Sequence, residues 1–221
     1  GALDIDGNGT ISKLDPEGTP VDLDWITGLN APKGMALDGS TLHVADIDRV
    51  VTIDVTTGKI IRSKTIEAAK FLNDVAIDSA GSLYVTETLL GRVYVLKDNK
   101  FEVLHDFGSD NRVNGILSVG DALFLTLSHN GELVRLSGNP PVAKTIASGL
   151  GGADGLVQLS DGSFLVCDWN GRILSVDKDG QVDQLLDTRD QGIQAADVTI
   201  IPEKSLLLVA TFEDNRVVCY R

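Results

Sequence analysis

The sequence has few basic residues, few aromatic residues and little cysteine. Lys and Arg together number 19 against 32 Asp and Glu, which gives a formal net charge of -13. So acidic a surface repels phosphates, which argues against nucleic acid as a partner. Two cysteines cannot form a disulfide framework, and we expect both Cys167 and Cys219 to be free thiols. No apolar run approaches the roughly 18 residues of a membrane helix, so we expect no membrane insertion.

A pattern typified by FLNDVAID at residues 71–78 recurs along the whole chain. It returns as PKGMALD at 32–38, VNGILSV at 113–119, ADGLVQL at 153–159 and AADVTII at 195–201. If the residue before the Gly or Asp marks the phase, successive markers are 40, 41, 40 and 42 residues apart. Spacing this even indicates an internal repeat. The phase residues are Lys33, Asn73, Asn114, Asp154 and Ala196.

Each unit of about 40 residues contains four β-prone runs separated by turn residues. Units of this length and pattern are typical of the four-stranded blades of a β-propeller. The sequence therefore predicts an all-β chain that forms a single β-propeller domain over residues 1–221. Blades are expected from about residues 32, 72, 113 and 153, with a partial first blade at 1–31 and a last blade at 195–221.

The two ends of the pattern are incomplete. Residues 1–31 supply two expected strands and residues 198–221 supply three, so the prediction is 21 strands where six full blades have 24. We expect a six-bladed type whose first blade is incomplete in this chain. Pairing of the two ends into one hybrid blade, which would give five, is the alternative.

Oxygen-bearing side chains recur at the phase position of three consecutive units, as Asn73, Asn114 and Asp154. The first strand of a propeller blade lies nearest the axis, so these positions are expected to meet around a central funnel. Buried carboxylate and amide oxygens are costly unless they bind something, and Ca²⁺ or Mg²⁺ would satisfy them. The alternative is that each side chain caps a turn at the start of its strand. Asp74 and Asp197 follow a phase position by one residue.

The loops between the second and third strands are expected to open on the same face as the funnel, where a ligand would sit. Trp169 in one of these loops is either a recognition residue or packs on a neighbouring blade. Lys33 at the first phase position could pair with Asp154 or with an anionic substrate. We predict that the substrate-binding residues include Lys33, Asp46, His129, Asp168 and Trp169.

The stretch DIDGNGTISKLD at residues 4–15 matches the ligand spacing of an EF-hand calcium loop. Asp15 stands where that loop has a bidentate Glu, and the following Pro16 breaks any second helix. A hairpin turn and a surface calcium loop are the two interpretations.

The segments FLNDVAID, VNGIL and ADGLV resemble the calcium-dependent six-bladed propellers of the gluconolactonase, senescence marker protein and luciferin-regenerating enzyme superfamily. Paraoxonase and diisopropyl fluorophosphatase are more distant relatives of that superfamily. WITGLNAPKGMAL, LVCDWNGRI and IPEKSLLLVATFEDNRVV look like a bacterial exported branch of it, which implies a periplasmic or secreted location. The resemblance implies that Asn73, Asn114 and Asp154 bind the catalytic metal. It also implies a further Glu from the first blade, and this sequence begins after the place where that Glu is expected.

The chemistry that fits these residues and this resemblance is the hydrolysis of lactones or related esters, with a small molecule as the substrate. A calcium or magnesium ion would polarise the carbonyl group, and a carboxylate would activate water. Asp154 could be a ligand or the base, and Asp74 or Asp197 is the other candidate base. A non-catalytic propeller that presents its rim loops to a ligand or protein partner is the competing hypothesis.

Overall fold

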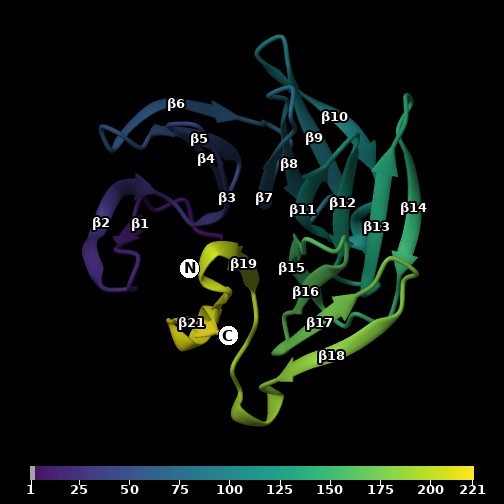
Figure 1. Ribbon diagram of the computed structural model, residues 1–221. Helices are drawn as coiled ribbons and strands as arrows, with labels where there is room; N and C mark the ends of the chain where they lie inside the picture. The colour runs from purple at the N-terminus through teal and green to yellow at the C-terminus, as the bar shows by residue number, and fades with distance from the viewer. Residues whose placement is uncertain (1–2) are drawn as a thin grey trace. The chain divides into compact units, whose positions relative to one another are not determined.

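The computed structural model describes residues 3–221, and their regular structure is almost entirely β. These residues form 21 strands in six antiparallel sheets: four sheets of four strands, one of three and one of two. In every sheet each strand pairs with its neighbour in sequence, as a meander (Figure 1). Helical structure in residues 3–221 consists of four three-residue 3₁₀ turns, and none is a candidate to span a membrane. The prediction of an all-β chain built from four-stranded units is confirmed.

The chain divides into two compact units, residues 1–106 and 107–221. The first unit holds one two-stranded and two four-stranded sheets. Its strands are β1 (Gly9–Leu14), β2 (Pro20–Leu29), β3 (Pro32–Asp38), β4 (Thr41–Asp46), β5 (Arg49–Asp54), β6 (Lys59–Thr65), β7 (Leu72–Ile77), β8 (Leu83–Glu87), β9 (Arg92–Lys97) and β10 (Lys100–Asp106).

The second unit holds two four-stranded sheets and the three-stranded sheet. Its strands are β11 (Val113–Val119), β12 (Ala122–Leu127), β13 (Glu132–Ser137), β14 (Val142–Ala147), β15 (Ala153–Gln158), β16 (Phe164–Asp168), β17 (Arg172–Val176), β18 (Val182–Asp187), β19 (Asp197–Ile201), β20 (Leu206–Ala210) and β21 (Val217–Tyr220). The 3₁₀ turns are η1 (Ser109–Asn111), η2 (Arg189–Gln191), η3 (Pro202–Lys204) and η4 (Phe212–Asp214).

The core of each unit lies between successive sheets. In the first unit, Val50 and Ala45 of one sheet pack with Val75 and Val85 of the next. In the second unit, Leu133 packs with Val166 and Leu174 in the same way. The second and third strands of the four-stranded sheets are largely buried, whereas the fourth strands are mostly exposed. The fourth run of each sequence unit is the most polar because its strand stays exposed and folding removes little of its surface from water.

The EF-hand-like stretch forms a hairpin in this structure. Strand β1 starts at Gly9, and its far end pairs with β2 at Leu14 and Pro20. Asp15 accepts hydrogen bonds from the N–H groups of Glu17 (3.0 Å) and Thr19 (2.8 Å) in the turn that follows. Because a strand separates Asp15 from Asp6, the two residues cannot close around one ion as in an EF-hand loop.

Candidate functional site

The first strand of every four-stranded sheet contains a β-bulge at the same position. In β11, Val113 pairs with Leu127 and Ile116 pairs with Leu125, so that two residues face one. The same shift occurs in β3, β7 and β15. A bulge turns side chains away from the regular alternation of a strand and is common beside functional sites. The residues at these bulges are Lys33-Gly34, Asn73-Asp74, Asn114-Gly115 and Asp154-Gly155.

Threonine hydroxyls on the second strands hold two of these bulges. Thr86 Oγ1 accepts the N–H of Asp74 at 2.9 Å, and Thr126 Oγ1 accepts the N–H of Gly115 at 2.7 Å. Thr126 Oγ1 also donates to the backbone carbonyl of Asp154 at 2.6 Å. The buried Thr126 hydroxyl therefore fixes the bulge of β11 and ties it to the bulge of β15 within the second unit.

Glycine at a bulge allows an Asp of the next sheet to approach closely. A Cβ atom at Gly34 would lie 2.0 Å from Asp74 Oδ1, and one at Gly155 would lie 2.0 Å from Asp197 Oδ1. The same oxygens accept the N–H of the following residue, at 2.8 Å for Asp74 and 2.7 Å for Asp197. Asp74 in the first unit and Asp197 in the second thus make the same contact. Both contacts are possible only because glycine has no side chain.

The second unit brings several of the predicted polar residues into one neighbourhood. Asp154 is only 9% exposed, and the Oδ1 atom of Asn114 is buried. The Cys167 thiol is fully buried, and its pKa is raised by that burial and then by the carboxylates of Asp197, Asp154 and Asp168. Three carboxylates therefore lie close enough to the Cys167 thiol, near the bulge of β15, to oppose its ionisation.

Asp197 is the most perturbed carboxylate of this group. The residue as a whole is exposed to solvent, but neighbouring protein atoms desolvate its carboxylate and raise its pKa to about 6. The hydrogen bond from the N–H of Val198 acts in the opposite direction and is the weaker effect. A carboxylate with such a pKa changes charge close to neutral pH, as a general base does.

The donor set at the bulges consists of carboxylate and amide oxygens, which suits a hard cation such as Ca²⁺ or Mg²⁺. Within residues 3–221 no three His, Cys, Asp or Glu side chains converge as a metal cluster. A cation held here would therefore need amide oxygen such as that of Asn114, together with water. Asn73 is at the equivalent bulge of the first unit, where its Nδ2 donates to Thr88 Oγ1 at 2.9 Å and so orients the amide.

Asp46 and Asp168 were both expected to contact substrate, and each accepts several hydrogen bonds from nearby residues. Asp46 is fully buried and accepts the N–H groups of Asn30 (2.9 Å) and Ala31 (2.8 Å) and the Nε of Arg49 (2.8 Å). Asp168 accepts the N–H of Gly152 at 2.9 Å and the Nε of Arg172 at 2.6 Å. Both carboxylates thereby fix the segment that enters the first strand of their own sheet.

The other expected substrate residues lie in separate surroundings. Lys33 Nζ donates to the carbonyl of Ala31 at 3.1 Å and lies 5.6 Å from the centre of the Phe71 ring. Burial lowers the pKa of Lys33, although Asp46 opposes this effect. His129 is exposed after β12.

Trp169 packs against Phe212, a residue that sequence reasoning did not identify. The two ring centroids are 4.8 Å apart, with an angle of 57° between the ring planes. Phe212 is 45% exposed and has a positive φ of 36°, an unusual conformation for a bulky residue. No periodic signal marks Phe212, because it belongs to a 3₁₀ turn outside the repeated strands.

No protein-family model and no curated protein matches the sequence. Solved structures do match: the chain superposes on one from a nidogen/laminin complex with a TM-score of 0.79 and 18% identity, covering 96% of this chain and 86% of that one. A virginiamycin B lyase from Staphylococcus aureus matches with a TM-score of 0.68 and 12% identity, over 86% of this chain and 69% of that one. An auxiliary nutrient binding protein from Bacteroides ovatus matches with a TM-score of 0.77 and 9% identity, over 97% and 65%. These likenesses, together with the sheets, show a β-propeller fold.

Proposed function

We propose that this chain is a divalent-cation-dependent hydrolase of lactones or related esters. The observation that carries the proposal is the repeated bulge, which holds Asn114 and Asp154 at equivalent positions of the packed strands β11 and β15. The resemblance of the sequence to gluconolactonase-like propellers supports the same class of function. The ion is Ca²⁺ or Mg²⁺, because both residues offer the oxygen donors that hard cations bind.

Within the second unit, Asn114 and Asp154 would hold the cation by their side-chain oxygens. The ion, when bound, supplies a Lewis acid for the carbonyl group of the substrate. Asp197 would accept the proton of the attacking water, since a carboxylate with a pKa of about 6 is mostly ionised at pH 7. Asp74, the other predicted base, belongs to the first unit and makes the equivalent contact there.

Calorimetric titration with CaCl₂ tests the cation site. We expect saturable binding to the unaltered chain, and at least about tenfold weaker binding after Asn114→Ala combined with Asp154→Asn, since the first change removes an oxygen ligand and the second removes the negative charge of another. Asp161→Asn is the matched control, because Asp161 is an exposed turn residue of the same unit. Equal affinity in all three proteins would refute the assignment of the ligands.

The pH dependence of hydrolysis tests the role of Asp197. Its raised pKa means that the carboxyl group is protonated and inactive as a base below about pH 6 and ionised above it. We therefore expect kcat/KM for a small lactone to rise with pH through about 6. Asp197→Asn should lower kcat/KM roughly 100-fold and abolish that rise. A rise with the same midpoint in Asp197→Asn would assign the base to another residue.

A second candidate, the non-catalytic binding module, is favoured by the pair of half-buried Trp169 and exposed Phe212. In a Trp25→Phe background, Trp169 is the single tryptophan, so its fluorescence reports on this pair. Saturable quenching by a lactone in the presence of a chelator, without product formation, would favour this function over hydrolysis. Quenching that requires calcium and accompanies turnover would favour the hydrolase.

A further inference from the structure

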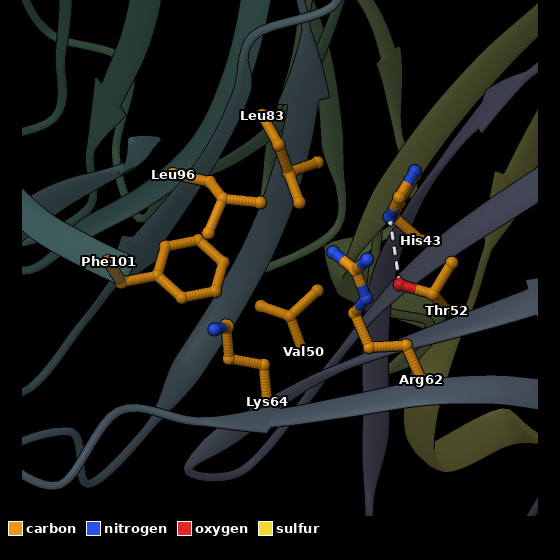
Figure 2. Close-up of a pocket in the computed structure, with 8 residues that line it drawn as sticks. All are labelled: His43, Val50, Thr52, Arg62, Lys64, Leu83, Leu96 and Phe101. Carbon is orange, nitrogen blue, oxygen red and sulfur yellow. Dashed lines mark hydrogen bonds between the residues drawn. The ribbon is translucent and has the colours of Figure 1, made fainter. Parts of the chain in front are cut away.

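The buried threonine hydroxyls of this chain differ in what they connect. In the first unit, Thr52 Oγ1 lies 3.2 Å from the Nδ1 atom of His43 on the neighbouring strand, beside a small hollow (Figure 2). Thr86 Oγ1 accepts the N–H of Asp74 within its own sheet. Thr126 on β12 instead connects its own sheet to the next sheet of the second unit, since its hydroxyl contacts both β11 and β15. These are the two strands that carry the candidate cation ligands.

The Thr126 hydroxyl acts both as acceptor and as donor. Its Oγ1 atom accepts the N–H of Gly115 at 2.7 Å and donates to the backbone carbonyl of Asp154 at 2.6 Å. All three residues are buried, and Thr126 is 0% exposed. Removal of the hydroxyl would therefore leave a buried N–H and a buried carbonyl without this partner, and bulk water does not reach them to replace it.

The two bulges approach each other closely at this point. A Cβ atom at Gly115 would lie 2.5 Å from the carbonyl oxygen of Asp154 and 3.1 Å from Thr126 Oγ1. Glycine therefore lets the backbone of β11 come close to this carbonyl, and the hydroxyl joins the two. The separation of the strands is thus fixed by backbone atoms and one short side chain.

The next pair of sheets is connected in another way. Cys167 is the last residue but one of β16, as Thr126 is of β12. Here the bulge N–H of Gly155 donates directly to the carbonyl of Ala196 at 3.2 Å. A direct backbone hydrogen bond thus joins β15 to β19, whereas a hydroxyl bridge joins β11 to β15.

Both hydrogen bonds of Thr126 end on backbone atoms next to a candidate ligand side chain. Gly115 directly follows Asn114, and the other bond reaches Asp154 itself. Threonine is stiff at χ1 because it is branched at Cβ, so the position of its hydroxyl follows from the backbone of β12. Oxygen ligands of Ca²⁺ must lie about 2.3 to 2.6 Å from the ion, so a relative shift of the two strands would spoil the geometry.

We propose that Thr126 is a positioning residue of the cation site and sets the separation between the side chains of Asn114 and Asp154. This inference rests on the proposed function, because it takes these two residues as the ligands. Thr126 does not touch the ion and acts through the backbone of the two strands. Groups that orient metal ligands in this way typically change metal affinity by about 10- to 100-fold when they are removed.

Calorimetric titration with CaCl₂ of the unaltered chain, Thr126→Val and Thr126→Ser tests the proposal. Valine keeps the shape of threonine without the hydroxyl, so we expect about tenfold weaker binding, whereas serine keeps the hydroxyl and should bind within about twofold of the unaltered chain. Thr126→Cys should give an intermediate affinity, since a thiol is a weak donor and acceptor. It is a second variant with residual hydrogen bonding, should the valine variant fail to fold.

Hydrogen exchange of the Gly115 amide gives a readout that needs no ion. This amide should exchange faster in Thr126→Val than in the unaltered chain and in Thr126→Ser, because its acceptor is lost. Thr211→Val is the matched control for both measurements. The buried Thr211 hydroxyl also accepts one N–H and donates to one carbonyl of the second unit, both of Arg216, and we expect its loss to leave calcium affinity unchanged.

Three results would overturn the positioning role. They are calcium affinity in Thr126→Val equal to that of the unaltered chain, binding by Thr126→Ser as weak as by Thr126→Val, and equal weakening by Thr211→Val. The amide spectrum of each variant shows whether it is folded, which separates lost binding from unfolding.

The variant that combines Asn114→Ala with Asp154→Asn separates this inference from the proposed function. Weak binding by that variant together with normal binding by Thr126→Val would overturn the positioning role alone. No calcium binding by the unaltered chain, or undiminished binding by the combined variant, would overturn both.

Discussion

Replacing Gly155 with alanine is expected to destabilise the second unit by about 3 kcal/mol, because the added methyl group overpacks a tight contact. The new Cβ would lie 2.0 Å from Asp197 Oδ1 and 2.7 Å from Asp197 Cα, so both side chain and backbone of Asp197 would have to move. That movement would also strain the hydrogen bond from the N–H of Gly155 to the carbonyl of Ala196, which is 3.2 Å long. The packing of strand β15 against strand β19 therefore depends on glycine at position 155.

Urea unfolding followed by circular dichroism measures this effect. Gly152→Ala is the matched control, since its nearest heavy atom would be Trp169 Cβ at 3.3 Å and a small adjustment relieves it. Gly34→Ala should reproduce the large effect in the first unit, where the Cβ would lie 2.0 Å from Asp74 Oδ1. A loss for Gly155→Ala no greater than that for Gly152→Ala would contradict the packing described here.

Removing the Asp168 side chain as Asp168→Ala is expected to cost about 4 kcal/mol, the usual range for one partner of a buried ion pair. Asp168 is 1% exposed, and its loss leaves Arg172 and the N–H of Gly152 without their acceptor. Burial alone would raise the pKa of this carboxyl, but hydrogen bonds from Asn170, Arg172 and Gly152 outweigh burial and lower it. The carboxylate therefore stabilises the folded state above its unfolded pKa, near 3.8, and this contribution is lost as pH falls through the lower folded value.

The measurement is the free energy of unfolding at pH 7 and at several values down to pH 3. Asp168→Ala should show a large loss at pH 7 and a shallower fall toward acid than the unaltered chain. Asp161→Ala is a suitable control, because this exposed Asp caps a local turn through Ser163 and its removal should cost less than about 1 kcal/mol. Similar losses in the two variants would mean that the buried hydrogen bonds of Asp168 add little stability.

The strands could be predicted from sequence because each repeat carries its own local signals. Runs such as LYVTE at residues 83–87 are β-prone and are bounded by turn residues, so neither their existence nor their order needs tertiary information. Even the change from buried to exposed strands follows from the polarity of each run. The 21 strands predicted in residues 1–221 match the 21 observed in residues 3–221.

The details of the candidate site could not be predicted in the same way. The bulge at Asn114-Gly115 depends on the Thr126 hydroxyl, which lies on another strand and also contacts Asp154. Asp168 looks like a loop carboxylate in the sequence, and only the fold shows its hydrogen bonds to Gly152 and Arg172. Such contacts depend on register and on packing between sheets, which local sequence patterns do not encode.

The pattern did contain one signal for the carboxylates at the strand ends. Asp46, Glu87 and Asp168 each end the second strand of a four-stranded sheet, and each accepts backbone N–H groups from the segment that enters the first strand. A carboxylate that recurs at a structural junction of a repeat is a candidate for such a role. The sheet that starts at β11 has Leu127 there, and Ser128 Oγ donates to the carbonyl of Arg112 instead.

A crystal structure of the chain soaked with a lanthanide substitute for calcium tests the central claim most directly, because anomalous scattering locates the ion. The account predicts a peak about 2.3 to 2.6 Å from the side-chain oxygens of Asn114 and Asp154, the range for oxygen ligands of Ca²⁺. A peak confined to Asp4, Asp6 and Asn8, or no peak at these two bulges at saturating ion, would contradict it.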